Sequence, residues 1–215
     1  MPLIGDHAPE FHAMTTQGKI DFPADYKGSW VVLFSHPADF TPVCTTEFIA
    51  LSRMNETFES LNTKLIGLSI DSLHSHLGWI KSIEALNFNN EGKVKIPFPI
   101  IADISMNVAR KYGMLQTVAN TQTVRAVFII DPEGMIRTIL YYPMSTGRNI
   151  PEIIRILQSL QLNDKTHYST PANWQPGDDV VMGAPLTIEE AQERLESSDN
   201  TIKPLDWYLT MKKMK

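Results

Sequence analysis

From Trp30 to Glu47 the chain reads WVVLFSHPADFTPVCTTE. The apolar run from Trp30 to Phe34 has the length and composition of a buried strand. After it, apolar side chains recur at helical spacing (Phe48, Leu51, Met54, Phe58 and Leu61), which predicts a helix from Thr45 to Leu61. Cys44, the single cysteine of the 215 residues, is therefore expected where a buried strand passes into the N-terminus of a helix.

Strand-like and helix-like segments alternate along most of the chain. Further strands are expected at 64–70, 97–101, 124–130 and 135–142, and further helices at 72–86, 105–112 and 150–160. The turn Asp131-Pro132-Glu133-Gly134 joins two of these strands into a hairpin. On the helix that follows Ser72, the inward face is expected to carry Leu73, Leu77, Ile80 and Ile83 or Glu84, with Trp79 beside it. This order predicts a thioredoxin-like α/β sandwich, a central mixed sheet flanked by helices, with an extended C-terminal arm.

The composition shifts near Asp164, which predicts a thioredoxin-like domain at 1–163 and a C-terminal arm at 164–215. A short helix is expected at 188–196, capped by Thr187 and Glu190. The arm has few core-forming runs but several large apolar residues, namely Trp174, Leu186, Leu205, Trp207, Tyr208 and Leu209. Another subunit is the natural place to bury them. The alternative is that the arm wraps around its own domain.

Overall composition narrows the class of protein. Apolar residues make up 43 % and charged residues 20 % of the chain, and the net charge is −5. This balance fits a globular protein with a large core and argues against nucleic acid as a partner. No apolar run approaches the ~20 residues of a membrane span, and no secretory pattern is visible, so a cytoplasmic location is expected. A lone free thiol suits that reducing compartment.

Cys44 can be interpreted in two ways. A lone cysteine can be a small buried hydrophobe with no chemical role. At a helix N-terminus, however, unpaired N–H groups and the helix dipole favour a thiolate, the nucleophilic form of the side chain. Arg125 is the best candidate for a supporting cation, because it opens a strand whose next five residues are apolar. Pairing with a thiolate would compensate the guanidinium for the solvation that it loses on burial. Alternatively, Arg125 could reach water at the strand end.

Four residues near Cys44 are candidates for supporting roles. Thr41 offers a hydroxyl to substrate and sulfur and can also cap the helix. Pro37 restricts the turn and shields the sulfur from water. His36 can hydrogen-bond around the pocket or tune it with pH, or be a satisfied structural histidine. Glu47 is expected to orient other groups, since a carboxylate beside the sulfur opposes thiolate formation.

The pattern Pro37-x-x-x-Thr41-x-x-Cys44 resembles the active-site motif of the peroxiredoxins, and the whole stretch 34–47 resembles their one-cysteine subgroup. Similar blocks continue along the chain at 68–72, 96–101, 141–149 and 170–174. The resemblance therefore covers the full length of the sequence.

This resemblance implies that Cys44 is the peroxidatic cysteine, which attacks hydrogen peroxide or an alkyl hydroperoxide and becomes a sulfenic acid. It also implies that Thr41, Arg125 and the backbone N–H groups of Val43 and Cys44 hold both peroxide oxygens. Arg148 is expected to support them in binding substrate. No metal or organic cofactor is expected, because the sulfur carries the redox chemistry.

The sequence departs from relatives in two places. Archaeal members of the subgroup often carry resolving cysteines near the C-terminus, but the aligned stretch 204–210 contains none. An external thiol or dithiol reductant, thioredoxin-like or small, is therefore expected. The mammalian subgroup has a second, phospholipase-like activity that needs a serine and a histidine. Here Ser29 is present, but Pro23 occupies the position where those relatives have the histidine. The phospholipase-like activity is therefore not expected.

The resemblance suggests homodimers formed by edge pairing of the strand at 135–142, with exchanged arms, closing into a homodecamer. It predicts an antioxidant peroxidase. Two other functions stay open: a peroxide sensor whose oxidised Cys44 acts on a partner, and a ring-assembled holdase chaperone.

Overall fold

The computed structural model describes residues 1–115 and 122–214. Within them the chain forms two compact units, Met1–Ile150 and Pro151–Lys215. The boundary expected after residue 163 falls inside helix α5, Ile150–Thr166. The long helix thus belongs almost wholly to the second unit.

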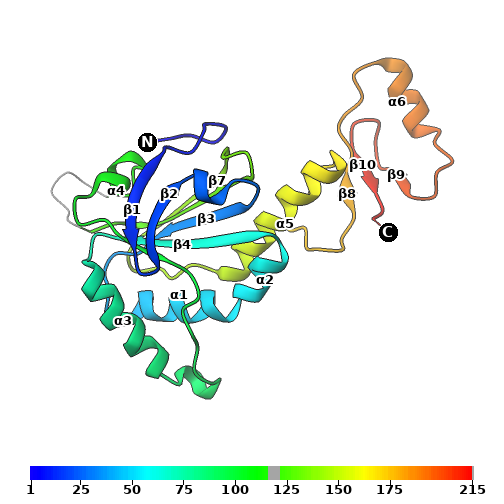
Figure 1. Cartoon of the computed structure of the whole chain (residues 1–215). Coiled ribbons are helices and arrows are strands. Elements are labelled where there is room, and N and C mark those ends of the chain that lie inside the picture. Colours follow the sequence, from blue (N-terminus) through cyan, green and yellow to red (C-terminus); the bar gives the residue numbers. More distant parts are fainter. Residues whose placement is uncertain (116–121, 215) are drawn as a thin grey trace. The chain divides into compact units, whose positions relative to one another are not determined.

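The first unit is built on a mixed sheet that, in the described residues, has the strand order β2-β1-β5-β4-β3-β6-β7 (Figure 1). Its strands are β1 (Phe11–Thr15), β2 (Gly18–Phe22), β3 (Trp30–Ser35), β4 (Thr63–Ser69), β5 (Ile100–Ala102), β6 (Arg125–Ile130) and β7 (Ile136–Tyr142). β3, β4 and β5 run parallel. β6 pairs antiparallel with β3, and β7 pairs antiparallel with β6. Because β3 is central and fully buried, its end is a sheltered position for reactive groups.

Helices cover both faces of this sheet. They are α1 (Pro42–Arg53), α2 (Asn55–Ser60), α3 (Leu73–Ala85) and α4 (Asn107–Lys111), with short 3-10 turns at Ala24–Tyr26 and Phe88–Asn90. Alternate residues of β3 face opposite sides. Leu33 joins a core that includes Val108 of α4, whereas Phe34 packs against Phe48 of α1, with ring centroids 5.5 Å apart. The predicted thioredoxin-like sandwich is confirmed.

Two details of the helices differ from expectation. The single helix predicted at 45–61 begins earlier, at Pro42, and is broken at Met54, whose φ/ψ of −93°/2° ends α1 and starts α2. The apolar spacing runs through the break, so periodicity alone does not reveal it. On α3 the buried residues are His76, Trp79 and Ile83, whereas Leu77 is 41 % exposed. A polar histidine thus occupies the inward face, which an apolar pattern cannot predict.

The second unit contains α5, the predicted short helix α6 (Ile188–Leu195), and a small sheet in the described residues, ordered β8-β10-β9. Its strands are β8 (Val180–Val181), β9 (Ile202–Pro204) and β10 (Thr210–Lys212). As expected, the Thr187 side chain caps α6 by accepting from the Glu190 N–H at 3.1 Å. Among the described residues, no helix combines the length and apolarity that crossing a membrane requires.

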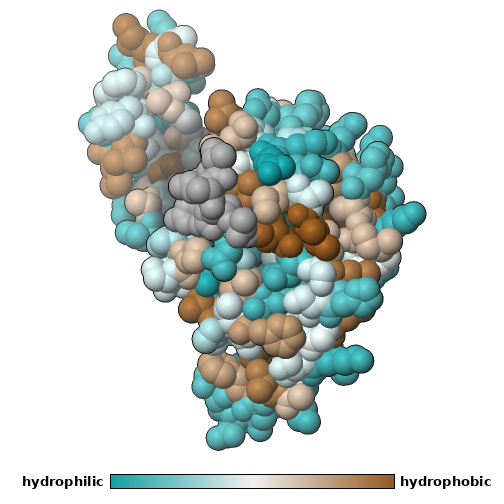
Figure 2. All heavy atoms as spheres, turned by 90° about the vertical axis from the view of Figure 1, so that its left-hand side faces the viewer, coloured by the Kyte–Doolittle hydropathy of each residue, from teal (hydrophilic) through white to brown (hydrophobic). Residues whose placement is uncertain are grey.

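Large apolar side chains of the second unit remain on its surface. Trp174 is buried, but Leu186 is 93 % exposed and Trp207 is 48 % exposed. Brown, hydrophobic side chains are visible on this unit in Figure 2. The unit therefore leaves several of its large apolar residues exposed, and exposed apolar residues of this kind are typical of interaction surfaces.

Candidate active site

Cys44 lies in the first turn of α1, directly beyond the loop that follows β3. Thr41 occupies the N-cap position and Pro42 the first helical position, where its missing N–H does no harm. The first-turn amides have no partner within a helix, so they present positive partial charge to groups nearby. The Cys44 side chain is fully buried at this position.

The predicted cation reaches the sulfur. Arg125, at the start of β6, directs Nη1 to the Cys44 Sγ at 3.2 Å, although 81 residues separate the two in sequence. Its Nε and Nη2 donate to the Met144 carbonyl at 2.9 and 2.7 Å, which fixes the plane of the guanidinium. Arg125 is only 3 % exposed. The side chain therefore does not reach out to water but pairs inside the protein.

Arg148 is a second buried guanidinium in the same cluster. Its Nε and Nη2 donate to Glu47 at 2.9 and 2.7 Å. Its Nη1 donates to the carbonyls of Ser35 and Ala126, and the group lies over the Phe34 ring. Arg148 thus joins the active-site cluster by holding Glu47, the residue that also accepts from Arg125 at 2.8 Å.

The charges of this cluster explain why a carboxylate can lie near the sulfur. Glu47 accepts hydrogen bonds from both Arg125 and Arg148, so its negative charge is fully paired. Two permanent cations against one carboxylate leave one positive charge in excess. That excess positive charge lies beside the Cys44 sulfur, because Arg125 Nη1 contacts it at 3.2 Å. Glu47 therefore orients the two arginines without cancelling their effect on the sulfur.

Thr41, Val43 and Pro37 precede Cys44 closely in the sequence. The Thr41 hydroxyl donates to the Ala38 carbonyl at 2.8 Å, and it makes no hydrogen bond to the first-turn amides. Its oxygen thereby keeps its lone pairs available to accept from a substrate. Pro37 is buried and Val43 is half-buried.

Replacing Thr41 by valine is expected to slow peroxide reduction about tenfold to a hundredfold, because one oxygen that can hold the substrate is removed. The free energy of unfolding should fall by only about 1 kcal/mol, the usual worth of one hydrogen bond. Stopped-flow oxidation and urea unfolding measure the two effects. Thr46→Val is the matched control, since Thr46 donates to the Val43 carbonyl from an exposed position one turn along. Equal rates in the two variants would contradict the role of Thr41.

His36 follows β3 directly and lies in the loop that leads to Cys44. Its hydrogen-bond partners are not predictable from the sequence. Its Nε2 is 2.8 Å from the Asp39 carboxylate, which also contacts His76 at 2.8 Å. Burial lowers the pKa of His36. Burial acts to raise the pKa of Asp39, but the hydrogen bonds from His36 and His76 outweigh it and hold that pKa below its ordinary value. The three-residue spacing of His36 and Asp39 is a weak signal, and nothing local points to His76.

These shifts predict that acid destabilises the protein. His36 has a folded pKa below its ordinary 6.5 and Asp39 one below its ordinary 3.8. Both groups bind protons more readily when unfolded, so their stabilisation is present at neutral pH and is lost as pH falls through these values. The urea midpoint should decrease from pH 7 to pH 4, and less so in Asp39→Asn. Asp103→Asn should not reduce the slope, because the folded pKa of Asp103 is raised by burial.

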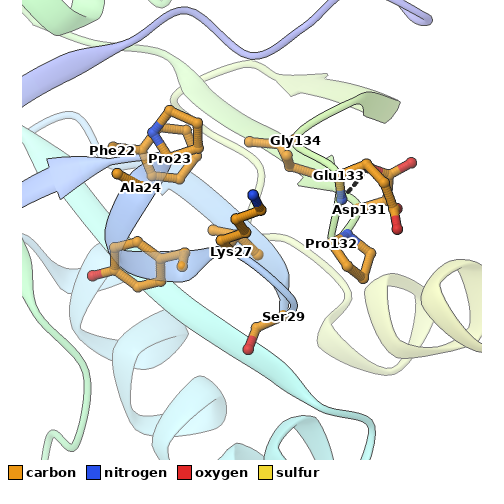
Figure 3. Close-up of a pocket in the computed structure, with 12 residues that line it drawn as sticks. Phe22, Pro23, Ala24, Lys27, Ser29, Asp131, Pro132, Glu133 and Gly134 are labelled. Atoms are coloured by element: carbon orange, nitrogen blue, oxygen red, sulfur yellow. Dashed lines mark hydrogen bonds between the residues drawn. The ribbon is translucent and has the colours of Figure 1, made fainter.

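The serine considered for a second activity lies in a separate pocket, shown in Figure 3. Pro23 and Asp131 also line this pocket, but none of the described residues around it is a histidine. The Ser29 hydroxyl lies 3.4 Å from the Asn62 side chain, and Asp131 accepts from backbone N–H groups of its own turn. In the described residues, the Ser29 hydroxyl thus lies beside an amide side chain rather than an imidazole.

Comparisons with known proteins place the site in context. Residues 4–139 match the AhpC/TSA family model, and residues 159–198 match the C-terminal domain of 1-Cys peroxiredoxin. A peroxiredoxin of Methanosarcina mazei is 58 % identical, with 99 % of this chain and 98 % of that protein covered. One of Aquifex aeolicus is 46 % identical, with 100 % and 98 % covered.

Two solved structures are similar over their entire length. A yeast mitochondrial 1-Cys peroxiredoxin, studied for thiol resolution by glutathione/thioredoxin systems, has a TM-score of 0.86 at 41 % identity. A cysteine-to-serine mutant of the peroxiredoxin 6 of Arenicola marina has a TM-score of 0.84 at 36 % identity. Both alignments cover 100 % of each chain.

Proposed function

Since the chain belongs to the peroxiredoxins, and to their one-cysteine type, we propose that it reduces hydrogen peroxide and organic hydroperoxides at Cys44 as an antioxidant enzyme. An external thiol or dithiol then regenerates the cysteine. The observation that carries this proposal is the 3.2 Å contact between Arg125 Nη1 and the Cys44 sulfur. It pairs a buried nucleophile with a permanent cation.

The residues support a direct displacement on the peroxide. The Cys44 thiolate attacks one oxygen, the S–O bond forms, and the O–O bond breaks with its electron pair on the distal oxygen. Sulfur is oxidised to sulfenic acid, and the released hydroxide or alkoxide takes up a proton to leave as water or an alcohol. Arg125, Thr41 and the first-turn amides of Val43 and Cys44 are suited to hold both oxygens and stabilise the developing charge.

An outside reductant is required because the chain has only one cysteine. No second thiol of the same chain can condense with the sulfenic acid. An identical subunit supplies only another Cys44, which is buried in its own site. A thioredoxin-like protein or a small thiol fits this need, as the yeast relative's link with glutathione/thioredoxin systems suggests. A free thiol in a reducing environment also supports a cytoplasmic location.

The decisive experiment is steady-state consumption of hydrogen peroxide and of an alkyl hydroperoxide with thioredoxin, glutaredoxin–glutathione or dithiothreitol as electron donor. Turnover is expected with at least one donor and is expected to be absent in Cys44→Ser. A purified, folded protein that leaves both peroxides unchanged with every donor overturns the proposal. Oxidation that occurs once but does not turn over favours the sensor function.

Excess peroxide is expected to overoxidise Cys44. With no internal thiol to intercept it, the sulfenic acid persists and can react with further peroxide to give sulfinic acid. Intact-mass spectra during a peroxide titration without reductant should show two oxygens added at Cys44. Cys44→Ser corrects for oxidation of the 10 methionines. A mass that stops at one added oxygen would show that the site protects its sulfenic acid.

We further propose that the protein forms homodimers that close into a homodecamer. In the described residues β7 is an edge strand of the central sheet. The N-terminal segment hydrogen-bonds to its start at Ile136, and the rest of this edge is suited to pairing with a copy of itself. The exposed apolar residues of the second unit supply a further surface to bury. Mass photometry tests the number of subunits.

A holdase function would be independent of catalysis if Cys44→Ser still suppresses aggregation of a client protein.

A further inference from the structure

His36, Asp39 and His76 form a deeply buried polar cluster that the proposed peroxide chemistry does not use. His36 directly follows β3, Asp39 lies in the same loop, and His76 lies on α3. Both histidines are fully buried and the Asp39 side chain is 1 % exposed. Their ligand-type atoms all lie within 4.8 Å of one another. Buried polar groups need hydrogen-bond partners and a balanced charge, so either protons at defined positions or a bound cation must neutralise the Asp39 carboxylate.

The contacts of His76 determine its charge. Its Nδ1 faces the Asp39 carboxylate, 2.8 Å from one oxygen and 3.0 Å from the other. Its Nε2 faces the backbone carbonyl of Ile101 at 3.2 Å. Both neighbours are acceptors, so both ring nitrogens must donate, and a ring with two N–H groups is an imidazolium.

The contacts of His36 select the opposite state. Its Nε2 must donate to Asp39 at 2.8 Å, because the carboxylate cannot donate. Its Nδ1 is buried and has no partner in the described part of the chain. A proton there would be an unsatisfied donor and a second positive charge beside His76, so His36 is neutral with the proton on Nε2.

We propose that Asp39 and His76 form a buried carboxylate–imidazolium pair that holds His36 in one neutral tautomer and positions the segment that carries Thr41 and Cys44. The role in positioning rests on the proposed peroxidase function. The assignment of the protons does not.

Asp39 is well placed to anchor this segment. Its side chain joins the end of β3 to α3 through the two histidines, and its backbone N–H donates to Asp71 at 3.0 Å. Thr41, two residues on, is tied back to the Ala38 carbonyl. Displacement of Asp39 would therefore move the hydroxyl and the start of α1, and reacting groups tolerate little misplacement.

A bound metal ion explains the same contacts less well. A histidine that ligates through Nε2 normally donates its Nδ1–H to a second partner. The Nδ1 of His36 has no such partner in the described residues. A proton on His76 satisfies every contact of the cluster without leaving a buried donor unpaired.

Neutron diffraction from deuterated crystals tests the proton assignment in the wild-type protein. Deuterons are expected on both nitrogens of His76 and on Nε2 alone of His36, with none on Asp39. A protonated Asp39, a singly protonated His76, or a metal ion between them overturns the proposal. Metal analysis of the purified protein provides an independent check.

Kinetics test the role in positioning. Asp39→Asn and His76→Gln keep the shape of the pair but remove one charge, and each is expected to lower the rate constant of Cys44 oxidation at least about tenfold. The double variant should be no slower than the single ones, because the two residues act as a unit. Asp103→Asn is the control: Asp103 is also buried but accepts from the backbone N–H groups of Val108 and Ala109.

The outcomes separate the two proposals. Wild-type rates in both single variants, or losses that add up in the double variant, would overturn the positioning role. A wild-type protein that consumes no peroxide would count against the peroxidase function, while the neutron result would still decide the ion pair. If a variant does not fold, the wild-type proton positions remain decisive.

Discussion

Arg125→Ala is expected to reduce the rate of Cys44 oxidation by hydrogen peroxide at least about a hundredfold, since loss of one preorganised charge-stabilising donor has effects of this size. The variant loses the cation 3.2 Å from the sulfur. It thereby loses both stabilisation of the thiolate and stabilisation of the charge that develops on the leaving oxygen. Stopped-flow measurement of a single oxidation isolates this step from the reductant.

Arg125→Lys distinguishes the two contributions of the guanidinium. Lysine keeps a positive charge but cannot reproduce the planar fork that donates to Cys44, Glu47 and the Met144 carbonyl at once. It should recover only part of the rate. Arg137→Ala is a control, because Arg137 pairs with Asp131 at a more exposed position on β7. Arg125→Ala with the wild-type rate would remove the main support for the assigned roles.

Glu47→Ala is expected to lower the free energy of unfolding by about 3–5 kcal/mol, the usual effect of removing one partner from a buried ion pair. Glu47 is 3 % exposed and accepts four side-chain or backbone hydrogen bonds from Arg125 and Arg148. Without it, two buried guanidinium groups lose the counter-charge that they share. Urea unfolding measures the loss, and Glu47→Gln should be milder because its amide oxygen still accepts.

An exposed ion pair provides the comparison for Glu47. Glu152 pairs with Arg155 one turn along α5, with side chains 37 % and 23 % exposed. Its replacement by alanine should change the unfolding free energy by only about 0–1 kcal/mol, because solvent screens such pairs. A Glu47 effect as small as that of Glu152 would mean that the two arginines find other partners.

Much of the architecture is encoded locally. The apolar run of β3, the helical spacing after Cys44 and the turn at 131–134 predict the elements because each pattern depends on neighbouring residues alone. The bounds of the helices are harder to predict than their existence. The break at Met54, for example, has no glycine or proline to mark it. Cys44 and Arg125 could also be identified, one from its place at a helix N-terminus and the other from an unpaired charge before an apolar strand.

Local patterns thus suffice to predict the alternating elements, the lone thiol with no partner in its chain, and a cation in need of a counter-charge. How the charges are shared depends on the folded arrangement: Glu47 binds two arginines, and His76 on α3 meets Asp39 beside β3. Local patterns depend on residues a few positions apart. These pairings join residues 37 to 101 positions apart, and they exist only because the sheet order brings β3, α3 and β6 together.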